Sequence, residues 1–143
     1  MRAREALKAP EALVLTMVLV AAADGGVTDR EIGVMAGQVQ TLPAFHEFTA
    51  ENLRTATDAA VNLLNEDEGL QHAALLMREA LEPRLRETAY ALACEVVAAS
   101  PVARQKTLEM LAFVREELDL DPLIAAAIER GVRVRHRRVD AGT

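Results

Sequence analysis

The sequence feature that most constrains the fold is an apolar run over residues 12–23, interrupted only by Thr16 and followed by Gly25-Gly26. The run is shorter than the roughly 20 residues that a membrane-spanning helix requires. Two consecutive glycines end a helix readily, because glycine adopts backbone conformations that a helix cannot continue. We therefore predict a helix over about residues 11–23 and no transmembrane span.

The composition favours closely packed helices. The chain has 143 residues, of which 51% are hydrophobic, and these include one Tyr, three Phe and no Trp. A chain of this length fits one domain that buries about two-thirds of its unfolded surface. A core made mainly of Ala, Leu and Val suits helices better than aromatic-rich sheets. We predict an all-α fold, a single compact bundle.

Helix start and stop signals divide this bundle into about seven helices. Thr28 to Glu31 form a capping-box sequence, and the pairs Ser100-Pro101 and Asp121-Pro122 each place a capping residue before a proline. The predicted helices cover about residues 11–23, 28–42, 49–64, 70–81, 83–97, 100–118 and 121–130, where Gly131 weakens the last one. The expected organisation is a basic arm (1–10), a helical domain (11–130) and a basic tail (131–143).

Three acidic residues, Asp24, Asp29 and Glu31, lie within the short turn between the first two predicted helices. Calcium prefers six to eight oxygen ligands, and the backbone near Gly25 could add carbonyl oxygens to the three carboxylates. The turn therefore predicts a divalent-cation site, with calcium as the most plausible ion. The alternative reading needs no ion: Asp24 accepts hydrogen bonds from the turn, Glu31 closes the capping box, and Asp29 favours the positive end of the second helix dipole.

A weak internal repeat relates this region to the later half of the chain. At a shift of 76 positions, Asp24 aligns with Ser100 and Glu31 with Thr107, and the apolar residues of the two segments coincide. The shift predicts two related helical hairpins, with the third and fourth helices between them in sequence. Both acids of the first turn are replaced by hydroxyl residues in the second.

The sequence Ala23-Asp24-Gly25 at a helix end, with Glu31 seven residues after the aspartate, resembles the TerB-like (tellurite-resistance) family over about residues 11–130. The resemblance implies an all-helical, cytoplasmic, bacterial domain. It implies a stress-response protein that binds a divalent cation, or a protein-interaction module like the TerB-like segments that accompany co-chaperone J-domains. Such proteins often carry a second acidic turn, which is degenerate in this chain.

The remaining chemistry-bearing residues give weaker signals. Cys94 has no second cysteine to pair with and lies on an apolar helical pattern, so we interpret it as a core residue. His46 and His72 have neighbouring acids, Glu47 and Glu68, but no second His or Cys at the spacing of a zinc site. The sequence holds no phosphate-binding loop, nucleophile elbow or zinc-protease helix, so we expect no enzymatic activity.

Charge is unevenly distributed along the chain. Its net charge is −6, yet the C-terminal segment is basic and contains the five arginines Arg130, Arg133, Arg135, Arg137 and Arg138. We expect this tail to be solvated or to dock on the protein itself. The second alternative is contact with an acidic protein partner or a second copy. Nucleic acid is not expected, because no aromatic residues alternate with the arginines. The sequence does not exclude association with a membrane surface. Glu5 and Glu11 interrupt the N-terminal pattern that a secretion signal requires, so we expect a cytoplasmic protein.

Overall fold

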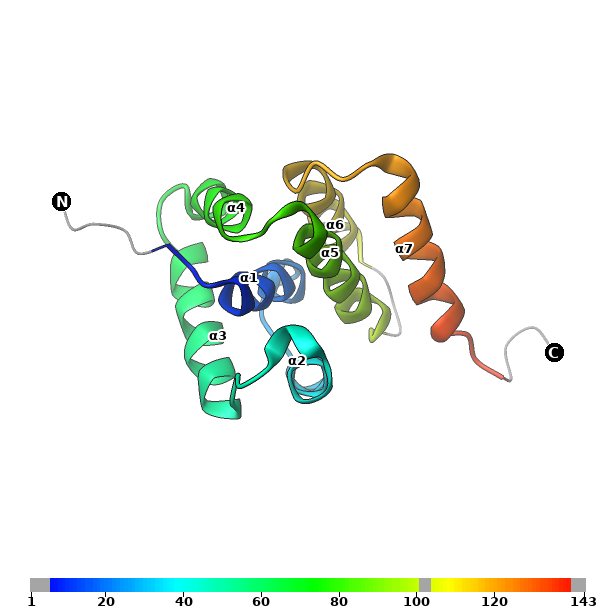
Figure 1. Ribbon diagram of the computed structural model, residues 1–143, viewed down its shortest axis with the longest axis horizontal. Coiled ribbons are helices and arrows are strands. Elements are labelled where there is room, and N and C mark those ends of the chain that lie inside the picture. Colours follow the sequence, from blue (N-terminus) through cyan, green and yellow to red (C-terminus); the bar gives the residue numbers. More distant parts are fainter. Residues whose placement is uncertain (1–5, 101–103, 140–143) are drawn as a thin grey trace.

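The computed structural model describes residues 6–100 and 104–139, and within these ranges it contains α-helices, one short 3-10 helix and no strand. This confirms the all-α prediction. The elements are α1 (Ala9–Ala22), α2 (Asp29–Thr41), η1 (Pro43–Phe45), α3 (Ala50–Leu64), α4 (Gly69–Ala80), α5 (Pro83–Ala98), α6 (Gln105–Glu117) and α7 (Pro122–Arg135) (Figure 1). One hydrophobic core takes buried residues from all seven α-helices.

Helix α1 is the centre of the bundle. Every residue from 12 to 21 is buried, and α1 packs on α2, α3, α4, α5 and α6 (Figure 1). A helix that is apolar on all faces is stable in water only when other elements enclose it. The one polar residue in this run, Thr16, donates its hydroxyl hydrogen to the carbonyl oxygen of Ala12 at 2.8 Å, so no polar group is left unsatisfied there. None of the helices in the described ranges has the length and apolar content to span a bilayer.

Capping residues mark the starts of α2, α3 and α7, and two of these signals, at Thr28 and Asp121, are predicted from the sequence. The capping box of Thr28 and Glu31 is formed at the start of α2. Thr49 caps α3 by accepting a hydrogen bond from the backbone N–H of Asn52 at 3.0 Å. Asp121 accepts from the N–H of Leu123 at 2.8 Å, with Pro122 as the first residue of α7. Local sequence therefore sets these boundaries.

The predicted start of the sixth helix at Ser100 is wrong. Ser100 follows the last turn of α5, where its backbone N–H donates to the carbonyl oxygen of Val97 at 3.2 Å. Pro101 lies outside the described residues. Helix α6 begins only at Gln105, because Arg104 before it has an extended backbone.

The last helix also differs from its prediction. Helix α7 continues through Gly131 to Arg135, so the first part of the predicted tail is helical. Val132 is buried, and α7 packs along α5 on the side of the bundle remote from α3 (Figure 1). The packing of this face compensates for the low helix propensity of a single glycine, about 1 kcal/mol relative to alanine.

Candidate functional site

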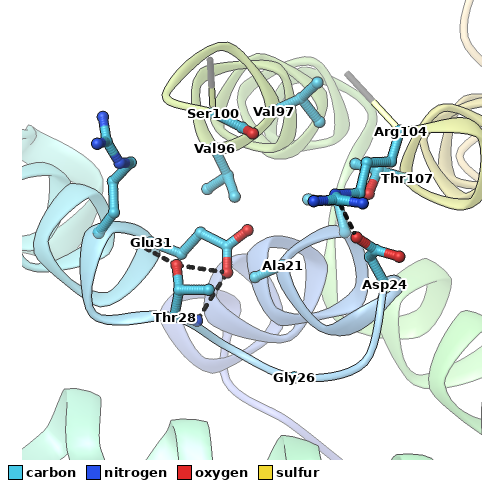
Figure 2. Close-up of a pocket in the computed structure, with 12 residues that line it drawn as sticks. Ala21, Asp24, Gly26, Thr28, Glu31, Val96, Val97, Ser100, Arg104 and Thr107 are labelled. Carbon is cyan, nitrogen blue, oxygen red and sulfur yellow. Dashed lines mark hydrogen bonds and ion pairs between the residues drawn. The ribbon is translucent and has the colours of Figure 1, made fainter. Parts of the chain in front are cut away.

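A pocket of about 350 Å³ lies between the α1–α2 turn and the facing ends of α5 and α6 (Figure 2). Its polar lining combines two carboxylates, two guanidinium groups and three hydroxyl groups. These are Asp24, Glu31, Arg30, Arg104, Thr28, Ser100 and Thr107. We call this space the hairpin pocket. For brevity, the consecutive helices α1 and α2 are called the first hairpin and the consecutive helices α5 and α6 the second hairpin; their relation as a repeat stays a prediction.

Asp24 is held at one end of the hairpin pocket by an ion pair. Its Oδ2 atom accepts from Nε of Arg104 at 2.8 Å, and the two side chains are 39% and 66% exposed (Figure 2). Gly25 makes the turn possible, because its φ of 119° lies in the region that side-chain-bearing residues avoid. Arg104 immediately precedes α6, so this pair joins the first hairpin to the second.

Glu31 lies at the other end of the hairpin pocket and closes the capping box. Its Oε1 atom accepts from the backbone N–H of Thr28 at 2.8 Å and from the Thr28 hydroxyl at 3.1 Å (Figure 2). In return, the Thr28 hydroxyl oxygen accepts from the N–H of Glu31 at 3.2 Å. Both of these bonds to the carboxylate use its Oε1 atom, and the carboxylate also lines the hairpin pocket.

A second contact between the hairpins runs in the opposite direction. Nη1 of Arg30, the second residue of α2, donates to the carbonyl oxygen of Ala99 at the end of α5, at 3.4 Å. The first hairpin thus contacts the second through the acid Asp24 and through the arginine Arg30. The two contacts together link the hairpins across the pocket.

The structure brings two of the three predicted ligands, Asp24 and Glu31, to the same pocket. Asp29 is exposed and does not line it. Asp29 and Glu31 are the first and third residues of α2, and two helical residues rotate the side-chain direction by about 200°. The described ranges contain no group of three His, Cys, Asp or Glu side chains placed to share one ion. Cation binding by these residues stays a prediction.

The donor chemistry of the hairpin pocket suits a hard cation in kind, because carboxylate and hydroxyl oxygens are the ligands that calcium accepts. The charge balance opposes it, since Arg30 and Arg104 offset the two carboxylates. A divalent ion would have to displace the Arg104 guanidinium from Asp24. That displacement is sterically possible, because the Arg104 side chain is largely solvent-exposed.

Sequence reasoning singled out neither Arg30 nor Arg104 as site residues, and it interpreted Ser100 and Thr107 only as hydroxyl replacements of the two acids. Both aligned pairs, Asp24 with Ser100 and Glu31 with Thr107, line the hairpin pocket. The helix bounds at these two turns are also 76 positions apart, since α1 and α5 end at residues 22 and 98 and α2 and α6 begin at residues 29 and 105, whereas α1 and α5 begin at residues 9 and 83.

The other candidate residues take structural positions. Cys94 is buried in the core as predicted, and burial raises the pKa of its thiol to about 11, so the nucleophilic thiolate is disfavoured. His46 lies 3.8 Å from Glu47, and both side chains are exposed. His72 lies 3.8 Å from Glu66.

A partly buried polar cluster joins the last three helices. Tyr90 of α5 is fully buried, and its hydroxyl donates to the carboxylate of Glu129 in α7. Nη1 of Arg115 in α6 donates to the same carboxylate at 2.9 Å. Burial, followed by the hydrogen bond to Glu129, raises the pKa of Tyr90, so the phenol stays protonated. This cluster anchors α7 to the bundle.

Comparison with known proteins adds no evidence for or against the TerB-like resemblance. No protein-family model matches the chain, and searches of curated proteins and of solved structures found no similar protein. The TerB-like resemblance therefore rests on the residues around Asp24 and Glu31 and stays a prediction.

Proposed function

We propose that this chain is a non-enzymatic, cytoplasmic stress-response protein of the TerB-like kind that binds a divalent cation in the hairpin pocket. The observation that carries the proposal is the convergence of the Asp24 and Glu31 carboxylates on one pocket that the hydroxyl residues Ser100 and Thr107 also line. Calcium is the preferred ion, because the carboxylate and hydroxyl groups of the pocket offer hard oxygen ligands. Asp29 would act only through its charge.

Binding would exchange the Asp24–Arg104 pair for direct cation contacts. The ion would then connect the α1–α2 turn to the start of α6, the role that the ion pair fills in its absence. A ligand that binds only the folded state stabilises it, by about 2.7 kcal/mol at a concentration one hundred times the Kd. Cation binding would therefore make the link between the two hairpins responsive to ion concentration.

The affinity should be low. Calcium affinity depends on the number of charged ligands and on the rigidity of the site, and this pocket offers two carboxylates against two arginines. We expect a dissociation constant on the order of 0.1–1 mM, the weak end of the calcium range. Replacement of Arg104 by glutamine should tighten binding, because it removes the competing positive charge.

Calcium titration into chelator-stripped protein by calorimetry tests the proposal. The Asp24→Asn, Glu31→Gln double variant removes both charges and preserves the start of α2, because glutamine also completes a capping box. Asp58→Asn with Glu79→Gln is the matched control, since both acids are exposed and lie outside the hairpin pocket. Saturable heats that only the first variant loses would support the proposal. Flat heats in the wild type and in Arg104→Gln would refute it.

The second candidate is a helical protein-interaction module of the co-chaperone-associated type, without a metal. The specific observation in its favour is a groove beside α7 that is lined by apolar residues and arginines and lies away from the acidic turn. On this reading, capture of a protein partner or of a second copy would be unchanged in the Asp24→Asn, Glu31→Gln variant.

A further inference from the structure

A second concave surface lies beside α7, between this helix and the helices α5 and α6. It encloses about 480 Å³, and its floor is apolar, formed by Val97, Ala98, Leu111 and Val132. The rest of the lining consists of Cys94, Glu129, His136 and the two exposed arginines Arg133 and Arg137, which we call its edge. We call this surface the α7 groove. It shares only Val97 with the hairpin pocket.

The carboxylates nearest to the α7 groove are already engaged by the protein. Glu95, whose side chain is 12% exposed, accepts from Arg135 and, at 2.8 Å, from Nε2 of His136. Glu129 accepts from Tyr90 and Arg115. Both acids are thereby offset by local donors, and neither is available to the two arginines at the edge.

Arg133 and Arg137 are exposed, and in the described part of the chain neither has a carboxylate oxygen within 4.0 Å. They form a positive rim in a protein whose net charge is −6. An apolar floor with a positive rim is complementary to a segment that is both apolar and negatively charged. Because the remainder of the molecule is acidic, an acidic segment is attracted only at this basic end, and this contrast would orient it toward the groove.

We propose that the α7 groove binds an acidic amphipathic helix of another protein. Apolar side chains of that helix would contact Val97, Leu111 and Val132, and its flanking carboxylates would pair with Arg133 and Arg137. Recognition of an amphipathic helix by an apolar groove is a recurrent mode of protein binding. A lipid surface fits less well, because the floor is concave and an anionic bilayer would repel the acidic remainder of the protein.

The probe for this proposal is a synthetic 18-residue peptide with leucine at helical spacing on one face and glutamate on the other. Its binding to ¹⁵N-labelled full-length protein is followed through amide chemical shifts. We expect saturable shifts confined to the α7 groove, at residues 94–98, 111 and 128–137. The Arg133→Gln, Arg137→Gln variant should weaken binding at least fivefold, and binding should weaken further as salt is added.

Three controls make the test decisive. Arg54→Gln with Arg84→Gln removes two exposed arginines elsewhere and should change the affinity less than twofold. A peptide with the same composition but scrambled leucines tests the amphipathic face, and a lysine-for-glutamate peptide tests the charge. Neither should bind at the concentrations that saturate the acidic peptide.

The proposal is overturned if the acidic peptide causes no shifts at millimolar concentration, or if its shifts map to another face. Equal binding of the lysine peptide, or equal binding by the Arg133→Gln, Arg137→Gln variant, overturns it as well. Protein that ignores the peptide but binds phosphatidylglycerol vesicles would assign the groove to a membrane surface instead. Self-association that involves these residues in the absence of peptide would assign it to a second copy.

Discussion

Replacement of Gly69 by alanine should destabilise the protein, although alanine is the better helix former. Gly69 is the first residue of α4 and follows Glu68, whose φ of 55° turns the chain sharply after α3. A Cβ atom at Gly69 would lie 2.2 Å from the carbonyl oxygen of Leu63 and 3.1 Å from Cα of Leu64. Both are backbone atoms at the end of α3, so no side-chain rotation relieves the contact.

The magnitude follows from this overlap. Relief requires the backbone at the α3–α4 turn to move by nearly 1 Å, and the Leu63 carbonyl already accepts from the N–H of Glu66 at 3.1 Å. Overpacking of this kind costs about 1–3 kcal/mol, and a clash with backbone belongs in the upper half of that range. A loss of about 2–3 kcal/mol should lower the Tm of a domain this size by roughly 5–10 °C.

Gly37→Ala is the matched control for this prediction. Gly37 lies inside α2, and nothing approaches an added Cβ within 4 Å. The same substitution there should stabilise the protein by about 0.5–1 kcal/mol through helix propensity. Urea and thermal unfolding followed by circular dichroism measure both variants. Equal stability of Gly69→Ala and the wild type, or a loss in Gly37→Ala as large as that in Gly69→Ala, would refute the reasoning.

Three further predictions concern the core, the buried thiol and the attachment of α7. Leu13 is fully buried in the central helix α1, so Leu13→Ala should lower the free energy of unfolding by about 3–5 kcal/mol in urea titrations. The pKa of Cys94 rises from 9.0 to about 11 on folding, so the unfolded chain releases the thiol proton first as pH increases. This difference alone should lower the stability by about 2 kcal/mol between pH 9 and pH 11. Cys94→Ala should flatten the decline between pH 9 and pH 10, where the contribution of Tyr90 is still small. Glu95 pairs with both Arg135 and His136 and so attaches the end of α7 to α5. Glu95→Gln should therefore increase amide hydrogen exchange at residues 130–135 several-fold while exchange in α1 stays constant. Unchanged exchange in α7 would contradict this role.

The helical character of the chain, most of its helix boundaries and the capping box at Thr28 follow from the sequence. These features depend on interactions between residues that are close in the chain, such as a hydroxyl and the N–H three positions later. The start of α6 was predicted incorrectly for the converse reason, because the signal at Ser100-Pro101 is local and Ser100 instead completes the last turn of α5. Likewise, Gly131 by itself predicts a helix end, but α7 continues through it because Val132 packs against the bundle.

The candidate site divides in the same way. The sequence singled out Asp24 and Glu31 from their spacing, and the 76-residue shift marked Ser100 and Thr107 only as hydroxyl replacements of these two acids. Only the tertiary structure placed all four around one pocket, turned Asp29 away from it and paired Asp24 with Arg104. Glu95 and its two partners are likewise separated by about 40 positions in the sequence. Contacts of this kind depend on how whole helices pack, and no local pattern in the sequence carries that information.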